Sequence, residues 1–527
     1  MPDNPDSQRH LVQNLLRQEQ ALHGADAVQL VETHISWLLL SGDYAYKLKK
    51  PLDLGFLDYS TLERRRRFCE EEVRLNRRTA PQLYLETVPV SGTVDNPCFG
   101  AGASILEYAV KMRRFPAGLL LDELLQTGRL PARIIDTLAD TVADFHAAAA
   151  RVAADLPLGT PEVAGQPVRE NFEQILPRLH DAAQLEQAQQ LAAWAAAEQQ
   201  RLVPLLRQRR ADGHIRECHG DLHLGNIVLL DDVPLPFDGI EFNDTLRWID
   251  VISDSAFLMM DLQARGRSDY AWRFLNAYLQ HTGDYAALPL LPWYLSYRAM
   301  VRAKVAAIRA AQAADDLTLR DHAAGDVAAY LTLAASYAAP RRPCLLITRG
   351  LSGSGKTRHS QVLLEQFSLV RLRSDVERKR LFGLAATASS GSTVGGGIYT
   401  ANAGEQTYAH LATTAAMILR SGQPVLIDAT FLRRAQRDRF HRLAEGLGIP
   451  FLIVEFHAAD AELRRRILQR SARGTDASEA SLAVLEQQLA TQEPLGEDER
   501  ARCIRVDTEQ GHADTRMLAQ VAELLRP

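Results

Sequence analysis

One octapeptide, GLSGSGKT at residues 350–357, constrains the fold of this chain more than any other feature. It follows an apolar run that we expect to be a strand, Cys344–Thr348, and it opens a stretch with helical character. The spacing GxxxxGK[ST] in that context is typical of a loop whose backbone N–H groups surround the phosphates of a nucleotide. The residues expected to bind nucleotide are therefore Gly350, Ser352, Gly353, Ser354, Gly355, Lys356 and Thr357.

Two oxygen-bearing side chains are candidates for a metal ion at this loop. The motif places Lys356 to reach the β- and γ-phosphate oxygens, and Thr357 to hold Mg²⁺ through its hydroxyl. Further along, the apolar run Val425–Ile427 ends in Asp428, which we expect to be the second residue of the Mg²⁺ site. An ordinary Asp at the end of a strand is the alternative. ATP and Mg²⁺ are the cofactors that this pattern predicts.

The region around the octapeptide alternates between expected strands and helices. After Cys344–Thr348, strands are expected at Leu369–Arg373, Pro424–Ile427 and Phe451–Phe456, with a helical stretch between each pair. This alternation predicts an α/β domain with a parallel sheet covered by helices on both faces. The segment Ala338–Pro343 is the expected linker before it, because its two prolines block helix continuation.

The strand Leu369–Arg373 leads into the sequence SDVER, which carries candidate catalytic residues. We expect this strand to neighbour the strand before the octapeptide, so that an Asp at its carboxyl end lies beside the γ-phosphate. Asp375 is then the candidate base for an acceptor hydroxyl. Arg378, one helical turn later, is the candidate contact to a phosphate or to the substrate.

Three arginines recur at positions i, i+4 and i+7 of a later expected helix: Arg466, Arg470 and Arg473. One helix face of arginines can close over ATP and stabilise the transferring charge. We therefore expect Arg466 and Arg470 to act in catalysis and Arg473 to bind the nucleotide. A solvated surface helix is the alternative.

A second chemical centre is expected far upstream, in HGDLHLGN at residues 219–226. Phosphoryl transfer requires a carboxylate that orients the attacking hydroxyl and metal ligands that gather the phosphate charge. Asp221 supplies the first of these as the catalytic base, and Asn226 lies five residues further on. A short strand–turn–strand then leads to Asp238 in FDG. We expect Asn226 and Asp238 to bind Mg²⁺, whereas two ordinary capped loops would be the alternative.

The run HGDLHLGNIVLL…FDGIEF resembles the aminoglycoside phosphotransferase family, within the protein-kinase-like fold, over roughly residues 10–335. The resemblance implies an α+β bilobal fold with a strand lysine paired to a glutamate of the following helix. Lys47, on the second strand of an expected hairpin, is the choice for the ATP phosphates, and Lys49 on the same strand face competes with it. Glu72 is the choice for the glutamate, with Glu71 as the alternative.

Other parts of this region carry further expectations. Glu107–Met112 resembles the hinge strand that meets adenine, and Asp250 with Asp254 is expected to brace the catalytic loop. Packing and orientation of that loop, not zinc binding, is the expected role of His219. The chain lacks a GxGxxG loop over the phosphates and an APE triplet after Asp238, so a protein substrate is not expected.

The C-terminal part has its own resemblance. SDxxR after the octapeptide is similar to P-loop polynucleotide kinases and, more loosely, to gluconate kinases and zeta-toxin kinases, over about residues 344–510. This resemblance implies transfer of a phosphate to a hydroxyl, with either a nucleic-acid 5′-hydroxyl or a small metabolite as the acceptor.

Composition limits the class of protein to which the chain can belong. With 527 residues, 46% of them hydrophobic and 24% charged, it is expected to fold into at least two globular domains. Its five cysteines form no CxxC pair, which argues against a disulfide framework and favours the cytoplasm. Residues 341–527 hold 26 Lys+Arg, 24 of them arginine, against 21 Asp+Glu. Arginine favours bidentate phosphate contacts, although a GC-rich genome also enriches it.

These observations predict a kinase with two unrelated phosphotransferase domains: residues 1–338 kinase-like, 339–343 a linker, and 344–527 a P-loop kinase domain. The expected acceptor of the first domain is a small molecule with a hydroxyl group, and no membrane partner is expected. Two alternatives remain. One domain could bind nucleotide only for regulation, or the C-terminal half could be a toxin-like or nucleic-acid-processing ATPase.

Overall fold

The computed structural model describes residues 5–24, 28–55, 57–312, 316–392, 395–473 and 478–525, without the side chains of residues 471–473. Contacts between Cα atoms divide the chain into two compact units. Unit 1 comprises Met1–Asp261 and Tyr297–Ala334, and unit 2 comprises Leu262–Ser296 and Ala335–Pro527. No helix among the described residues is both long and apolar enough to cross a bilayer.

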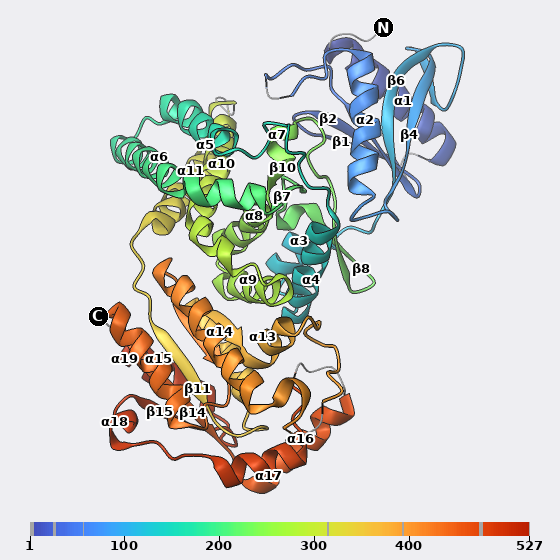
Figure 1. The fold of residues 1–527 in the computed structure, drawn as a ribbon. Helices are drawn as coiled ribbons and strands as arrows, with labels where there is room; N and C mark the ends of the chain where they lie inside the picture. Colours follow the sequence, from blue (N-terminus) through green and yellow to red (C-terminus); the bar gives the residue numbers. More distant parts are fainter. Residues whose placement is uncertain are drawn as a thin grey trace. The chain divides into compact units, whose positions relative to one another are not determined.

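Unit 1 begins with a six-stranded antiparallel sheet in the order β1-β2-β3-β6-β4-β5, flanked by two helices (Figure 1). Its elements are α1 (Pro5–His23), β1 (Val28–Glu32), β2 (Ser36–Ser41), β3 (Tyr44–Lys49), α2 (Leu62–Asn76), β4 (Tyr84–Thr93), β5 (Asn96–Phe99) and β6 (Ile105–Arg113). The apolar face of α1 packs with Leu39, Leu48 and Ala109, whereas α2 packs with Val110. Because adjacent residues of a strand point to opposite faces, α1 and α2 cover opposite faces of the sheet.

The remainder of unit 1 is mainly helical. Its elements are α3 (Leu121–Gln126), α4 (Ala132–Ala148), α5 (Pro161–Ile175), α6 (Ala182–Ala211), β7 (Ile215–Glu217), β8 (Ile227–Leu230), β9 (Val233–Pro236), α7 (Asp244–Arg247), β10 (Trp248–Asp250), α8 (Val251–Ala264), α10 (Leu291–Gln312) and α11 (Leu317–Ala338). The helices α8, α10 and α11 continue past the boundary into unit 2. An α+β kinase-like fold is thereby confirmed for this region.

The expected strand–turn–strand after Asn226 is the antiparallel hairpin of β8 and β9. Its two turn residues, Asp231 and Asp232, have φ values of 49° and 62°. Positive φ at both central residues is the requirement of a type I′ turn, which matches the twist of the flanking strands. This tight return brings the FDG sequence back beside the loop that carries Asn226: Phe237 N–H donates to Asn226 O at 2.9 Å.

Unit 2 contains a five-stranded sheet, parallel throughout, in the order β12-β13-β11-β14-β15. Its elements are α9 (Ser268–Thr282), β11 (Leu345–Arg349), α12 (Lys356–Phe367), β12 (Val370–Arg373), α13 (Ser374–Leu381), α14 (Ala401–Arg420), β13 (Val425–Asp428), α15 (Arg434–Leu447), β14 (Phe451–His457), α16 (Asp460–Arg473), α17 (Leu482–Thr491), α18 (Glu497–Arg500), β15 (Cys503–Asp507) and α19 (Ala513–Leu524). The expected α/β P-loop architecture is confirmed.

One expectation about this sheet is wrong. The strand that leads to Asp375 is β12, and β13 lies between it and β11, the strand before the octapeptide. The chain passes from β11 out to β12 and then returns to β13, and this change of direction determines which face of the sheet each helix covers. Because parallel crossovers are right-handed, the step from β11 out to β12 puts α12 on one face, and the return through α14 to β13 uses the other. Asp428, at the end of the intervening strand, therefore stands between the octapeptide and the start of α13.

The free edge of β12 is covered by residues 268–290, which lie in the chain well before the first strand of the sheet, β11. These residues form α9 and a 3₁₀ turn at Tyr285–Leu290. Asn276 of α9, only 5% exposed, donates from Nδ2 to Leu369 O at 2.9 Å and accepts from Arg371 N–H at 2.7 Å. One side-chain amide thus satisfies a carbonyl and an N–H that a further strand would otherwise pair.

We expect Asn276→Ala to destabilise unit 2 by about 1–3 kcal/mol, because it leaves two backbone groups of the sheet edge without their partner. Urea unfolding of the full chain, followed by a probe of the C-terminal sheet, measures the change. Asn276→Asp is the matched comparison: it keeps the acceptor for Arg371 N–H but sets a buried carboxylate oxygen against Leu369 O, so its loss should be at least as large. Equal stability of Asn276→Ala and the unaltered chain would show that this edge contact contributes nothing.

Candidate active sites

The first candidate site is built around the side-chain amine of Lys47 on β3. Lys47 Nζ donates to Glu72 Oε1 at 2.9 Å and to Asp238 Oδ1 at 2.5 Å. Lys49, fully buried on the same strand, donates to Glu72 Oε2 at 2.5 Å and to Glu241. Burial raises the pKa of Glu72, but the two ammonium groups outweigh it and hold that pKa at about 2. Glu72 is therefore ionised and shared by both lysines, and only Lys47 also contacts the FDG aspartate.

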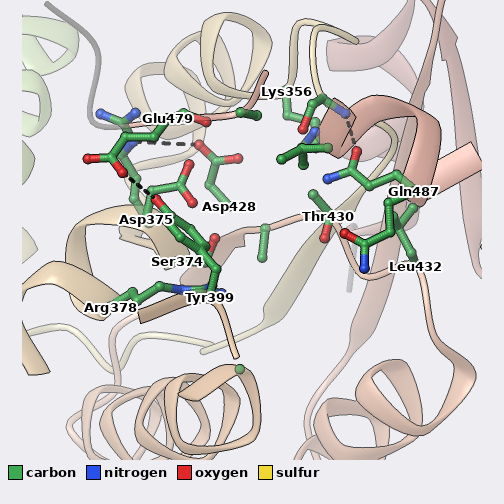
Figure 2. Close-up of a pocket in the computed structure, with 18 of the residues that line it drawn as sticks. Lys356, Ser374, Asp375, Arg378, Tyr399, Asp428, Thr430, Leu432, Glu479 and Gln487 are labelled. Atoms are coloured by element: carbon green, nitrogen blue, oxygen red, sulfur yellow. Dashed lines mark hydrogen bonds and ion pairs between the residues drawn. The ribbon is translucent and has the colours of Figure 1, made fainter. Parts of the chain in front are cut away.

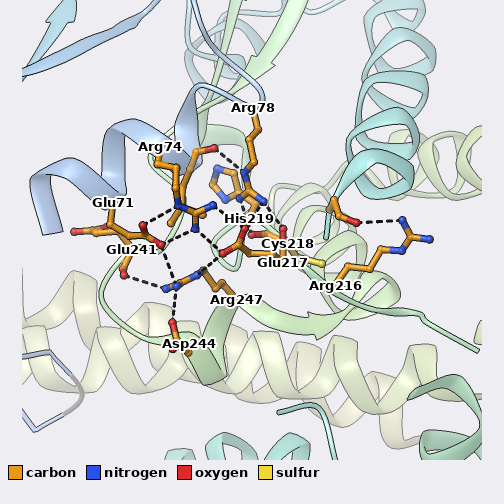
Figure 3. A network of polar contacts seen from close by, with 12 residues as sticks. Glu71, Arg74, Arg78, Arg216, Glu217, Cys218, His219, Glu241, Asp244 and Arg247 are labelled. Atoms are coloured by element: carbon orange, nitrogen blue, oxygen red, sulfur yellow. Dashed lines mark hydrogen bonds and ion pairs between the residues drawn. The ribbon is translucent and has the colours of Figure 1, made fainter. Parts of the chain in front are cut away.

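The alternative glutamate, Glu71, belongs to a different network, which Figure 3 shows. Its carboxylate accepts from Arg74 and, at 3.2 Å, from Arg247. The same two arginines also reach Glu217 of β7, at 2.6 and 3.4 Å respectively. Arg78 donates to the Glu217 carbonyl at 2.7 Å. These arginines fasten α2 to the strand that leads into the HGD loop, so the helix that bears Glu72 is tied to the loop that bears the candidate base.

The candidate base Asp221 is partly exposed and has two neighbours in its own loop. Asn226 Nδ2 donates to Asp221 Oδ2 at 3.0 Å, and His223 Nε2 lies 3.5 Å from the same oxygen. Burial raises the pKa of Asp221, but the imidazole of His223 outweighs that effect and holds the pKa well below its usual range. Asp221 is an ionised carboxylate at neutral pH. The structure thus gathers Asp221, Asn226, Asp238, Lys47 and Glu72 in one place.

Asp254 braces this loop, as expected. Its carboxylate accepts from the backbone N–H groups of His219 and Gly220, at 3.0 and 2.9 Å. It also lies 3.1 Å from Nε2 of buried His146, a residue that sequence reasoning missed because nothing near it marks a site. His219 lies against the Phe237 carbonyl through Nε2 at 2.8 Å, which fits the orienting role expected for it. Asp250 instead forms a buried ion pair with Arg209.

Arg298 of α10 also supports the HGD loop, although no motif in the sequence marks this residue. Its Nη1 donates to Gly220 O at 3.0 Å, its Nε donates to Ser253 O at 3.3 Å, and its guanidinium lies 4.7 Å from the Phe257 ring centre. A buried cation on the carbonyl of the HGD glycine fixes the backbone one residue before Asp221.

The second candidate site is the loop between β11 and α12. Gly350 has φ 148°, and a Cβ there would lie 2.4 Å from Phe456 O, so only glycine fits. Lys356 Nζ donates to Gly350 O at 3.0 Å and to Leu351 O at 2.8 Å, so its amine is held across the loop. Burial lowers the pKa of Lys356 to about 8. A buried amine inside a ring of backbone groups is ready to bind phosphate oxygens.

The two expected metal ligands of this loop meet. Thr357 Oγ1 donates to Asp428 Oδ2 at 2.8 Å, and Arg373 Nε lies 3.9 Å from the same oxygen. A hydroxyl and a carboxylate are hard oxygen donors of the kind that Mg²⁺ prefers. The site therefore fits the expected cation in donor chemistry.

These residues line a cleft of about 1110 Å³, which Figure 2 shows. Asp375 and Arg378 line it from α13, and Lys356, Thr357 and Asp428 line it from the sheet edge. Tyr399 stands beside Arg378, with the guanidinium 4.9 Å from its ring centre. Tyr399 Oη also donates to Glu479 at 3.4 Å. The expected base and the expected phosphate-binding residues thus line the same cleft.

The arginines of α16 differ from one another in their contacts. Arg466 donates to Gly353 O at 3.3 Å and to Thr508 Oγ1 at 2.9 Å, so it is attached to the phosphate loop itself. Arg470 lines the cleft and donates to Ala480 O at 2.9 Å. The side chain of Arg473 lies outside the described residues. Sequence reasoning missed Gln488 of α17, whose Oε1 accepts from Ser352 N–H at 2.8 Å.

Two different family models match two separate parts of the chain. Residues 58–291 match the model of the phosphotransferase enzyme family, and residues 345–495 match the model of an AAA domain. Uncharacterized proteins of Mycobacterium tuberculosis and Mycobacterium bovis are each 29% identical to this chain over 461 residues, which is 87% of this chain and 89% of theirs. The similarity therefore extends over most of this chain and most of each relative.

Solved structures are similar to one half or the other. A gluconokinase from Sinorhizobium meliloti is 24% identical and covers 35% of this chain and 94% of its own, with a TM-score of 0.26. An amicoumacin kinase in complex with AMP-PNP, Ca²⁺ and Ami is 13% identical and covers 59% of this chain and 88% of its own, with a TM-score of 0.39.

Proposed function

We propose that this chain, a kinase that carries a phosphotransferase-family domain followed by a P-loop kinase domain, transfers the γ-phosphate of ATP to a hydroxyl acceptor at each of its two centres. The observation that supports two active centres is that each gathers a complete set of groups: a carboxylate base, a phosphate-binding lysine and oxygen ligands for a cation. A centre kept only for regulation has no need of the base. We further propose Mg²⁺ as the metal and the cytoplasm as the location.

At the N-terminal centre, Lys47 holds the α- and β-phosphates of ATP, and Glu72 fixes the lysine in place. Asp221 accepts the proton of the acceptor hydroxyl. The hydroxyl oxygen forms a bond to the γ-phosphorus, while the bond from that phosphorus to the ADP oxygen breaks. Asn226 and Asp238 would hold Mg²⁺, which would neutralise charge on the phosphates. The acceptor that we propose here is a small molecule with a hydroxyl group.

At the C-terminal centre, the loop around Lys356 holds the triphosphate, and Thr357 and Asp428 would hold Mg²⁺, which would neutralise charge on the phosphates. Asp375 takes the proton from the acceptor hydroxyl, and ADP leaves from the opposite side of the γ-phosphorus. Arg466 and Arg470 stabilise the negative charge that spreads over the transferring group. Arg473 is proposed as a further nucleotide contact from the same helix. A base that faces the same cleft as the phosphate loop supports transfer to an acceptor over simple hydrolysis.

Labelled ATP tests this proposal on the full chain, on Asp221→Ala and on Lys356→Ala. We expect a panel of hydroxyl compounds to include one acceptor whose labelling is lost only in Asp221→Ala, and another whose labelling is lost only in Lys356→Ala. Release of inorganic phosphate alone by the full chain, with no acceptor labelled, would instead support the alternative of an ATPase. Loss of all labelling in only one variant would make the other domain a regulatory module.

A further inference from the structure

The cleft of unit 2 is more basic than a nucleotide and its metal require. Its lining includes eight Lys and Arg side chains against four Asp and Glu. Lys356, Arg466 and Arg470 lie at or near the phosphate loop, where they are assigned to ATP. Other arginines line the cleft from α13, the helix that also carries Asp375, and from α15. Unlike Arg466, Arg378 and Arg439 make no hydrogen bond to the phosphate loop among the described residues.

Arg378 of α13 is the first of these. Its Nε is buried and has no hydrogen-bond partner among the residues that the structure describes. Its other contacts hold it in place without satisfying that nitrogen: Nη1 donates to Ile398 O at 3.4 Å, and the guanidinium stacks near Tyr399. Figure 2 shows Arg378 and Tyr399 side by side, on the side of the cleft where Asp375 lies.

Arg439 of α15 is the second. Its Nη2 donates to Glu405 of α14, whereas its Nη1 is buried and has no partner within the described ranges. Both Arg439 and Glu405 line the cleft. The carboxylate of Glu405 neutralises part of the guanidinium charge but accepts a hydrogen bond only from Nη2. The N–H groups of Nη1 therefore remain available to a ligand.

A buried guanidinium N–H without an acceptor is costly, since it has given up water and gained nothing. Two such donors that line one cleft from different helices are best satisfied by a ligand with several acceptor oxygens. Phosphate and carboxylate groups have that geometry, and arginine binds both in bidentate fashion. A polycationic acceptor would be repelled by the same side chains.

We propose that Arg378 and Arg439 bind an anionic group of the acceptor, so that the C-terminal centre phosphorylates a small hydroxyl compound that carries a phosphate or a carboxylate. This proposal rests on the proposed function of that centre. The anion is held between α13 and α15, and the hydroxyl of the same molecule is left for Asp375. Unlike a neutral sugar or alcohol, such an acceptor is selected by charge.

Binding of inorganic phosphate tests the anion site without any turnover. The full chain is first saturated with AMP-PNP and Mg²⁺, and phosphate is then titrated by calorimetry. We expect Arg378→Gln and Arg439→Gln each to weaken the binding of phosphate at least tenfold, with the affinity for AMP-PNP unchanged. Arg442→Gln, an exposed arginine one turn further along α15 that does not line the cleft, is the matched control and should bind phosphate normally. Equal phosphate affinity in all three variants and the unaltered chain overturns the proposal.

A set of matched acceptors shows whether the site selects a carboxylate, a phosphate or a nucleic acid. A sugar, its aldonic acid and its phosphate ester are compared with a short oligonucleotide that ends in a 5′-hydroxyl, each with labelled ATP. Preference for the acid or the ester that disappears in Arg439→Gln supports the proposal and identifies which anion is bound. Preference for the neutral sugar overturns it, as does labelling of the oligonucleotide with a steep salt dependence. Absence of transfer to every compound, with phosphate still bound by Arg378 and Arg439, would instead reject the proposed function and leave the anion site standing.

Discussion

Replacing Asp221 with alanine is expected to lower phosphate transfer at the N-terminal centre by about 10²–10⁴-fold, because the acceptor hydroxyl loses the carboxylate that takes its proton. ATP binding should survive, since Lys47 and Glu72 are untouched and hold each other at 2.9 Å. Initial rates with labelled ATP measure the first effect, and calorimetry with AMP-PNP measures the second. Asp140→Ala, which removes an exposed carboxylate from α4, serves as the control and should leave both unchanged.

A variant of the metal site distinguishes the base from its neighbours. Asp238→Ala should weaken nucleotide binding in the presence of Mg²⁺ as well as the rate, because Asp238 is both a proposed metal ligand and a partner of Lys47. If Asp221→Ala transferred phosphate to the N-terminal acceptor at the full rate, Asp221 could not be the base.

The second large effect is expected at Lys356. Lys356→Ala should eliminate nucleotide turnover at the C-terminal centre, whereas Asp375→Asn should bind ATP normally and lose transfer to the acceptor. The difference arises because Lys356 is held at the carbonyl groups of the phosphate loop, while Asp375 lies on α13 at the acceptor side. Turnover is measured for each variant in the Asp221→Ala background, which silences transfer at the other centre. AMP-PNP affinity is measured in the Asp238→Ala background, in which nucleotide binding at the other centre is expected to be weakened. Transfer at the unaltered rate by Asp375→Asn would remove Asp375 from the mechanism.

The pH dependence of nucleotide binding gives this prediction a second readout. Burial lowers the pKa of Lys356 to about 8 in the nucleotide-free loop. Below that pH the amine is charged and attracts the triphosphate, and above it the neutral form predominates. The dissociation constant of AMP-PNP at this centre should therefore rise as the pH passes 8, and the slope should be absent in Lys356→Ala. A flat profile for the unaltered centre up to pH 9 would contradict the charge assigned to this lysine.

Local motifs supply most of the candidate residues of both centres, because the residues that such chemistry requires lie within short stretches of the sequence. HGDLHLGN with FDG, and GLSGSGKT with SDVER, each place their reactive groups within one or two loops, so the spacing alone indicates which side chains meet. The Lys47–Glu72 pair spans more chain, and the sequence left it open against Lys49 and Glu71. The structure brings Lys47 to Asp238 and turns Glu71 toward Arg74 and Arg247.

Long-range contacts escaped sequence reasoning for a physical reason. The position of β13 between β11 and β12 depends on the direction of a crossover, which no residue of β12 encodes. Arg439 and Glu405 reach the cleft from helices whose exposed polar faces look ordinary in sequence. Arg298 and His146 support the HGD loop from helices that come together only when the chain folds. The predicted domain boundary, with residues 339–343 as the linker, stays a prediction. Contacts between Cα atoms place Leu262–Ser296 in unit 2.

The side-chain amide of Asn276 on the edge of β12 has a consequence for exchanging these catalytic modules between proteins. Residues 268–290 lie inside the range that matches the phosphotransferase enzyme family, yet they complete the sheet of the P-loop domain. A chimera spliced at the proline-rich stretch around residue 340 would pair a foreign first module with a sheet whose edge is bare. Such an unpaired edge is a template for association with other chains. A transferred P-loop module should therefore include residues 268–290, which lie within the range that matches the other family model.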